Sequence, residues 1–147
     1  MQWLTLEAEA MSAQPSSFLG KGWCFPPSFQ VNGNLVDMVS GEGDIQQSMQ
    51  IILSTANGER VMLGDFGCNL NQFLYEEIDQ SLANGIAEAV KDGLLKYEAR
   101  IDVENVDVDV SDGEAGLVLI NITYQVRMTN SRFNMVYPFY INEGSPL

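Results

Sequence analysis

The feature that most constrains this chain is a change in the spacing of its apolar residues at Arg100. Over 44–100, apolar residues recur every three or four positions, which is typical of helices that bury one face. Over 101–141 they alternate with polar residues in three successive runs, which is typical of antiparallel strands with one buried face. We therefore predict an α+β fold, a two-layer domain in which an antiparallel β meander packs against helices.

The mainly helical part is expected to span 44–100. Asp44 is predicted to cap the first helix, with Gln47 reaching back in a capping box, and Asn57-Gly58 ends it. A short strand is allowed over 58–63, followed by a short helix that Asn69 can cap. Asp79 is predicted to cap the longest helix. Its expected apolar face comprises Leu82, Ile86, Ala89, Val90, Gly93, Leu94 and Tyr97.

The two ends of the chain carry different signals. Residues 1–17 end in a Gln-Pro-Ser-Ser breaker and are expected to form a flexible N-terminal arm. The remaining 18–147 are expected to form one domain. Within it, 18–43 is rich in glycine, proline and aromatic residues and follows neither period, so we expect an irregular arm there. The strands are predicted over 101–141, with a β-bulge where the alternation slips at Glu104-Asn105.

Composition excludes several classes of function. The net charge is −13, so the chain is expected to bind neither nucleic acid nor anionic membrane surfaces. The chain has no histidine, which removes Ser-His-Asp and Cys-His catalysis and most catalytic zinc sites. Cys24 and Cys68 are far apart and are expected to be reduced thiols of a cytoplasmic protein. Neither a signal peptide nor a membrane span is apparent.

Candidate catalytic and metal sites are weak. A calcium loop starting at Asp107 would need glycine at the sixth position and glutamate at the twelfth, where Asp112 and Val118 stand. The alternating valines favour a strand with an acidic face instead. No carboxylate pair is singled out among the 20 acidic residues. We therefore predict no catalytic residue, no cofactor and no metal site.

Charged residues near two turns are more informative. Arg60 and Asp65 flank a glycine-rich turn, and Glu98 and Arg100 lie at the end of the longest predicted helix. One interpretation of Glu98 and Arg100 is helix termination with a surface ion pair worth under about 1 kcal/mol. The other is a contact with a partner. The residues by themselves do not decide between these two interpretations.

Several segments together resemble a known family. They are FLGKGWCFPPSF, ILSTANGERVMLGDFGCNL, KYEARIDVENVDV and ITYQVRMTNSRFNMVYPFYINEG, in this order. The chain is similar over 18–144 to the GPW/gene 25-like family of baseplate wedge proteins. It most resembles members from extracellular contractile injection systems, which are phage-tail-like particles. The resemblance implies a non-enzymatic structural subunit of the baseplate.

The resemblance also implies roles for individual residues. The family's Glu-Pro-Arg signature matches Glu98 and Arg100, with Ala99 in place of proline. This implies that the two charged residues dock into wedge proteins. The matching turn extends the implied docking set to Arg60 and Asp65. The family's strands resemble the core of sheath subunits, which implies strand addition at an edge. The residues expected on that edge are Phe133, Met135, Tyr137 and Phe139.

The partners that follow from the resemblance are a sheath subunit, baseplate wedge proteins, and hub or tube proteins. Several copies are expected in a sixfold baseplate, assembled in the cytoplasm into a particle that can be released from the cell. Two alternatives stay open. One is a tail lysozyme acting on peptidoglycan, because older labels attach that activity to the family, and the other is a generic soluble adaptor.

Overall fold

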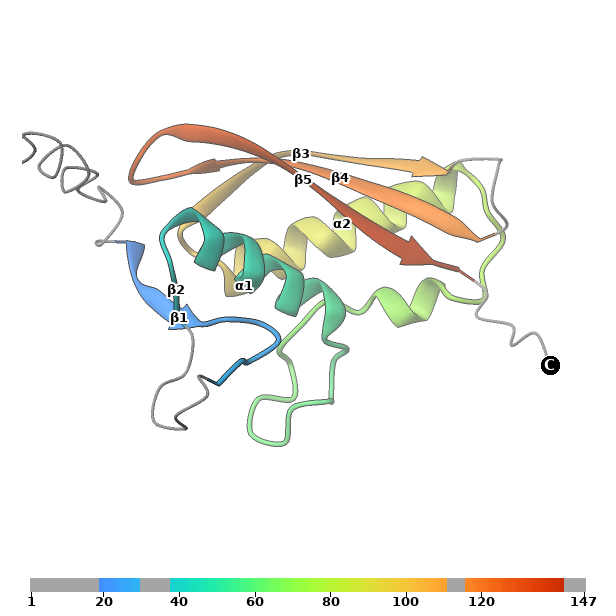
Figure 1. Ribbon diagram of the computed structural model, residues 1–147. Helices are drawn as coiled ribbons and strands as arrows, with labels where there is room; N and C mark the ends of the chain where they lie inside the picture. The colour runs from blue at the N-terminus through green and yellow to red at the C-terminus, as the bar shows by residue number, and fades with distance from the viewer. Residues whose placement is uncertain (1–18, 30–37, 111–115, 142–147) are drawn as a thin grey trace, which may run out of the picture. The chain divides into compact units, whose positions relative to one another are not determined.

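The computed structural model describes residues 19–29, 38–110 and 116–141 (Figure 1). The chain divides into two compact units, 1–44 and 45–147. The flexible arm predicted over 1–17 lies outside the described residues, as does the predicted turn at Asp112-Gly113.

The first unit contains a short antiparallel pair of strands. β1 (Lys21–Trp23) pairs with β2 (Met38–Ser40), with Gly22 opposite Val39. A Cβ atom at Gly22 would collide with the Asp44 carboxylate, so a larger residue there would force the Asp44 side chain to move. The sequence predicts an irregular arm over 18–43, and this strand pair lies within it. Three-residue strands are too short to show a period of two, which is why the sequence pattern did not reveal this pairing.

Helix α1 (Glu42–Ser54) begins two residues before the predicted cap at Asp44. It follows Gly41, whose φ of 69° ends the preceding strand in a conformation that favours glycine. Its buried face is the predicted apolar stripe, which consists of Ile45, Met49, Ile52 and Leu53.

Helix α2 (Gln80–Tyr97) confirms the predicted cap. The backbone N–H of Leu82 donates to Asp79 Oδ1 at 2.7 Å, and Asp79 itself has extended backbone angles. The buried residues are Leu82, Ala83, Ile86, Val90, Gly93 and Leu94. Ala89 and Tyr97, which were expected on this face, are half-buried.

Three long strands form the main sheet. β3 (Ile101–Val110), β4 (Leu117–Val126) and β5 (Ser131–Tyr140) are antiparallel in the order β3-β4-β5. The register shifts between Val103 and Asn105, which confirms the predicted bulge. Figure 1 shows α1 and α2 on the same face of this sheet. The two-layer α+β prediction is therefore confirmed. The buried residues of the central strand are Val118, Ile120, Ile122, Tyr124 and Val126.

The connection between the helices differs from the prediction in detail. Residues 58–63 form turns and bends, not a strand. The side chains of Val61 and Met62 are both exposed there, so the apolar pattern does not reflect a buried strand face. The short helix that follows is a single 3-10 turn, η2 (Leu70–Phe73), and the Asn69 side chain makes no capping hydrogen bond to it.

The cap of α2 provides a first prediction. Replacing Asp79 with alanine removes the acceptor for the Leu82 N–H, and we expect unfolding free energy to fall by about 1 kcal/mol. Urea denaturation followed by circular dichroism measures this. Glu88→Ala is the control, since Glu88 is exposed in the middle of the same helix. Equal stability of Asp79→Ala and wild type would contradict the capping role.

Candidate functional site

Helix α2 ends at a buried charge. Glu98 is the C-cap residue, and its backbone N–H donates to the carbonyl oxygen of Leu94 at 2.9 Å. Its side chain is 4% exposed, and among the described residues it is the one buried charged side chain. A carboxylate in such a position needs compensating partners, because burial of an unpaired charge is costly.

Arg100 provides most of this compensation. Its Nε donates to Glu98 Oε1 and its terminal NH2 group to Oε2, each at 2.8 Å, and its backbone N–H also lies 3.3 Å from Oε1. The two side chains thus form a bidentate fork, the strongest common geometry for this pair. Arg100 itself is 29% exposed. The geometry differs from the exposed ion pair that the helix-termination interpretation assumes.

The ionisation of Glu98 reflects this environment. Burial disfavours the charged form, but hydrogen bonds from Arg100 and Ser48, together with the Arg100 charge, outweigh it, so the pKa of Glu98 is lowered. Ser48 lies in α1. The Glu98 carboxylate therefore connects α1, the end of α2 and the turn into β3.

Arg60 belongs to a column of side chains beside this pair. Its guanidinium carbon lies 3.9 Å from the centre of the Phe66 ring, and the Phe66 and Tyr97 rings are 4.9 Å apart. Lys96 Nζ lies 5.0 Å from the centre of the Tyr97 ring. The alternation of cations and rings attaches the loop 57–67 to the end of α2. The contact between Phe66 and Tyr97 has no signal in the sequence, since nothing in their spacing predicts it.

Asp65 takes part through its backbone. Its carbonyl oxygen accepts a hydrogen bond from the Tyr97 hydroxyl. Gly67 has a φ of 112°, and a Cβ atom there would collide with the Thr55 carbonyl oxygen. The structure therefore places Arg60 and Asp65 in one loop that packs on Tyr97, the residue before Glu98.

The expected strand-addition residues lie on β5, which is an edge strand in the described sheet. Phe133, Met135 and Tyr137 are half-buried and Phe139 is buried, so these four side chains face the helices. The Phe133 ring lies 5.9 Å from that of Tyr124 on β4. A strand added at this edge would pair with the β5 backbone, and its own side chains on this face would lie beside these four residues.

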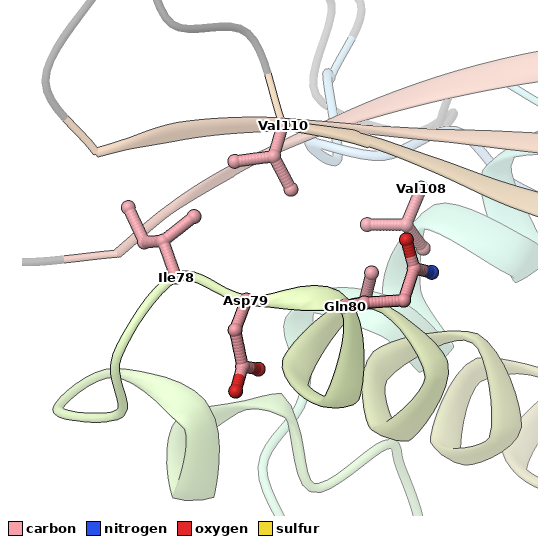
Figure 2. A pocket seen from close by; sticks show the side chains of 6 residues that line it. Ile78, Asp79, Gln80, Val108 and Val110 are labelled. Atoms are coloured by element: carbon pink, nitrogen blue, oxygen red, sulfur yellow. The ribbon is translucent and has the colours of Figure 1, made fainter.

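A shallow hollow of 320 Å³ lies between the start of α2 and the end of β3 (Figure 2). It is lined by Ile78, Asp79, Gln80, Ala83, Val108 and Val110. Its one carboxylate, Asp79, accepts the capping hydrogen bond of α2. A second hollow, of 450 Å³, lies between α2 and the β3 bulge and contains Glu88, Asp92 and Glu104. Glu104 there pairs with Arg132 at 3.0 Å.

Both cysteines are free thiols. Burial, with a smaller contribution from the charge of Asp92, raises the pKa of Cys68 to about 11, so the thiol is a poor nucleophile at neutral pH. Its Sγ donates to the Ala89 carbonyl oxygen at 3.3 Å. Within the described ranges, no cluster of three potential metal ligands occurs. No helix in the same ranges has the length and apolar character needed to cross a membrane.

Comparison with known proteins identifies the family. A family model described as baseplate wedge protein gp25 matches residues 39–131. This match covers more than half of the chain, so the chain belongs to the baseplate wedge protein gp25 family. The family resemblance seen in the sequence is confirmed. A search of curated protein sequences finds no match.

Solved structures share the fold. A Geobacter sulfurreducens protein, provisionally named a tail lysozyme, is 43% identical with a TM-score of 0.66, over 71% of this chain and 94% of its own. A chain of the antifeeding prophage baseplate is 22% identical with a TM-score of 0.64, over 88% of this chain and 92% of its own. A chain of the post-contraction pyocin R2 baseplate is 24% identical with a TM-score of 0.54, over 69% of this chain and 98% of its own.

The lowered pKa of Glu98 predicts how stability depends on pH. The folded form binds a proton at Glu98 less readily than the unfolded chain, whose glutamates titrate near pH 4.3. The carboxylate therefore stabilises the fold fully above that pH, and its contribution is lost as the pH falls through the lowered pKa. We expect Glu98→Gln to lower unfolding free energy by about 1–3 kcal/mol at pH 7 and by less at pH 3.

Urea titrations of wild type and variant at the two pH values measure this difference. Glu104→Gln is the matched control, since it removes a carboxylate that pairs with an arginine at the surface. Its effect should stay below about 1 kcal/mol. A loss for Glu98→Gln that is unchanged between pH 7 and pH 3 would contradict the argument.

Proposed function

We propose that this chain is a non-enzymatic structural subunit of the baseplate of a contractile injection system. It would link wedge proteins and the central hub or tube to the first ring of the sheath. Membership of the baseplate wedge family supports the general role. The observation that carries the specific proposal is the Glu98–Arg100 fork at the end of α2, in which Glu98 is buried and Arg100 is partly exposed.

The fork suits docking because it combines rigidity with access. Both Glu98 oxygens hold the guanidinium of Arg100 in one orientation, while 29% of the arginine side chain remains exposed. An arginine fixed before binding loses less rotamer entropy when a partner contacts it. A wedge protein that offers a carboxylate or backbone carbonyl groups would therefore bind with good geometry.

The fork also compensates for the missing proline of the family signature. Ala99 lies in the turn between α2 and β3, where proline would restrict the backbone. The hydrogen bond from the Arg100 backbone N–H to Glu98 Oε1 closes the same turn. We propose that the ion pair provides the rigidity that proline provides elsewhere in the family.

Strand addition to a sheath subunit is assigned to the β5 edge because β3 is the less suitable edge. β3 carries Asp102, Glu104, Asp107 and Asp109 and contains the bulge at Val103/Asn105. Acidic side chains and bulges both discourage the pairing of another strand. The outward side chains of β5 include no carboxylate; they are Arg132, Asn134, Val136, Pro138 and Tyr140. β5 is therefore the edge that a sheath strand would extend.

Several copies of the chain are proposed to assemble in a sixfold baseplate. The antifeeding prophage baseplate, which contains a chain of this fold, was determined with sixfold symmetry. The excess of acidic residues supports partners with basic surfaces, because opposite potentials accelerate encounter. Assembly in the cytoplasm, followed by release of the particle from the cell, completes the proposal.

The docking role is tested with a variant that removes both charges. Glu98→Gln/Arg100→Gln leaves no unpaired buried carboxylate, so the purified protein should remain folded. Contacts that Arg100 makes with a wedge protein should weaken by about 2–5 kcal/mol. We expect electron microscopy of particles from the mutant strain to show incomplete baseplates or tubes without sheath.

Lys91→Gln provides the control for this experiment, since Lys91 is an exposed cation on the same helix. Particles of the control should be normal. Sheathed particles at wild-type yield from the double variant would contradict the docking role and would show that Glu98 and Arg100 serve only the fold of the chain.

The tail lysozyme activity is the alternative, since it is the provisional name of a protein 43% identical to this chain. A glycosidase acid needs a pKa raised by burial and a second carboxylate across the cleft. The buried carboxylate in the described chain is Glu98, whose pKa is lowered and which is bound to Arg100. A carboxylate held ionised by an arginine cannot donate the required proton at neutral pH.

A peptidoglycan turnover assay on the purified protein separates the two functions. We expect no release of soluble fragments above that of buffer, while hen lysozyme as the positive control releases them. If turnover occurs, the assay is repeated with the Glu98→Gln/Arg100→Gln variant. Turnover by both proteins would support a lysozyme whose catalytic residues lie elsewhere in the chain.

A further inference from the structure

The loop 57–67 exposes an apolar tip that the proposed contacts do not use. Val61 is 98% exposed, Met62 95% and Leu63 50%. Single exposed apolar residues are common, but three in succession at the end of one loop form a patch that typically marks an interaction site. Their place in the sequence, between turn residues, gave no sign of this.

The loop holds the tip in a defined shape. At its base, Gly58 N–H donates to the Gly64 carbonyl oxygen at 2.6 Å, and the Glu59 carboxylate accepts from Ala56 N–H at 3.1 Å. Farther along, the Phe66 ring contacts the Tyr97 ring in a tilted arrangement. A loop braced on both sides gives up little entropy on binding, so apolar contacts at its tip convert efficiently into affinity.

Charge indicates what kind of partner fits. The chain has a net charge of −13, so a second copy approaching this loop would be repelled. Beside the loop lies a hollow of 200 Å³ whose lining includes Asp65 and Asp92 against the single cation Lys96. Lys96 also contacts the ring of Tyr97. The hollow therefore favours a basic side chain from outside.

We infer that the tip Val61–Leu63 inserts into an apolar pocket of a different protein, and that a lysine or arginine next to this pocket enters the hollow lined by Asp65 and Asp92. This surface is distinct from the Glu98–Arg100 fork and from the β5 edge. In a baseplate, this surface would provide a third contact with a partner. The inference rests on the proposed function only in taking the baseplate as the assembly in which this contact forms.

The first test removes the apolar tip. Val61→Ser/Met62→Ser should leave the thermal midpoint of the purified protein unchanged, because neither side chain is buried. Incorporation of the variant into particles should fall about tenfold or more, since two apolar side chains no longer enter the pocket. Tyr75→Ser is the matched control, because Tyr75 is also a large, almost fully exposed side chain outside this loop.

Normal incorporation of the double variant would overturn the inference, and so would an equal loss for Tyr75→Ser. Sedimentation of the purified wild type and of the double variant shows whether the tip binds a second copy of this chain. A dimer that the double variant abolishes would show that the occupant is another copy of this chain, which also overturns the inference. A monomer in both proteins agrees with a different partner.

The second test uses oxidation of Met62. Hydrogen peroxide should oxidise Met62 rapidly in the free protein, as measured by mass spectrometry, and at least about tenfold more slowly in assembled particles. Buried Met49 serves as the slow reference in both samples. Equal oxidation of Met62 in both samples would overturn the inference. Absence of the wild-type chain from any particle would instead refute the proposed function.

Discussion

The bidentate pair of Glu98 and Arg100 is the interaction on which the arrangement of the main unit depends. It lies where the helical part of the chain changes into the sheet, and the Glu98 carboxylate also accepts a hydrogen bond from Ser48 of α1. A buried ion pair contributes less to stability than a well-packed apolar group of the same size. Its retention at this position is therefore better explained by geometry, because it fixes how α1, α2 and β3 meet.

The neighbouring Tyr97 extends this order outward. Its ring contacts the Phe66 ring at a tilt and its hydroxyl donates to the Asp65 carbonyl oxygen, so the loop 57–67 takes its position from the last turn of α2. One helix end thus determines both a buried charge cluster and an exposed apolar tip. A change that frays this helix end would alter two surfaces at once, although they share no residue.

The sequence predicted the elements better than the site. Long periodic stretches predicted α2 and the three long strands, because many residues in each element follow the same spacing. The break in the alternation of apolar and polar residues predicted the bulge at Val103/Asn105. The pairing of β1 with β2 rests on three residues in each strand and has no such signal. Burial of Glu98 was also unpredictable, since it depends on Ser48, fifty residues earlier in the chain. The sequence allows a strand at the exposed tip because an apolar run has the same pattern whether it is buried or exposed.

The acidic character of the chain is distributed so that each edge of the sheet behaves differently. On β3, Asp107 and Asp109 alternate with half-buried Val108 and Val110, which keeps the outer face charged. Unpaired edges are otherwise sites of aggregation, and like charges along β3 oppose its pairing with a second copy of the same strand. β5 has no such row of carboxylates, although Pro138 removes one backbone N–H from it, and it pairs only with β4 in the described sheet. The two edges of the sheet therefore differ chemically: the carboxylates of β3 repel another acidic strand, whereas the β5 edge carries no such row of charges.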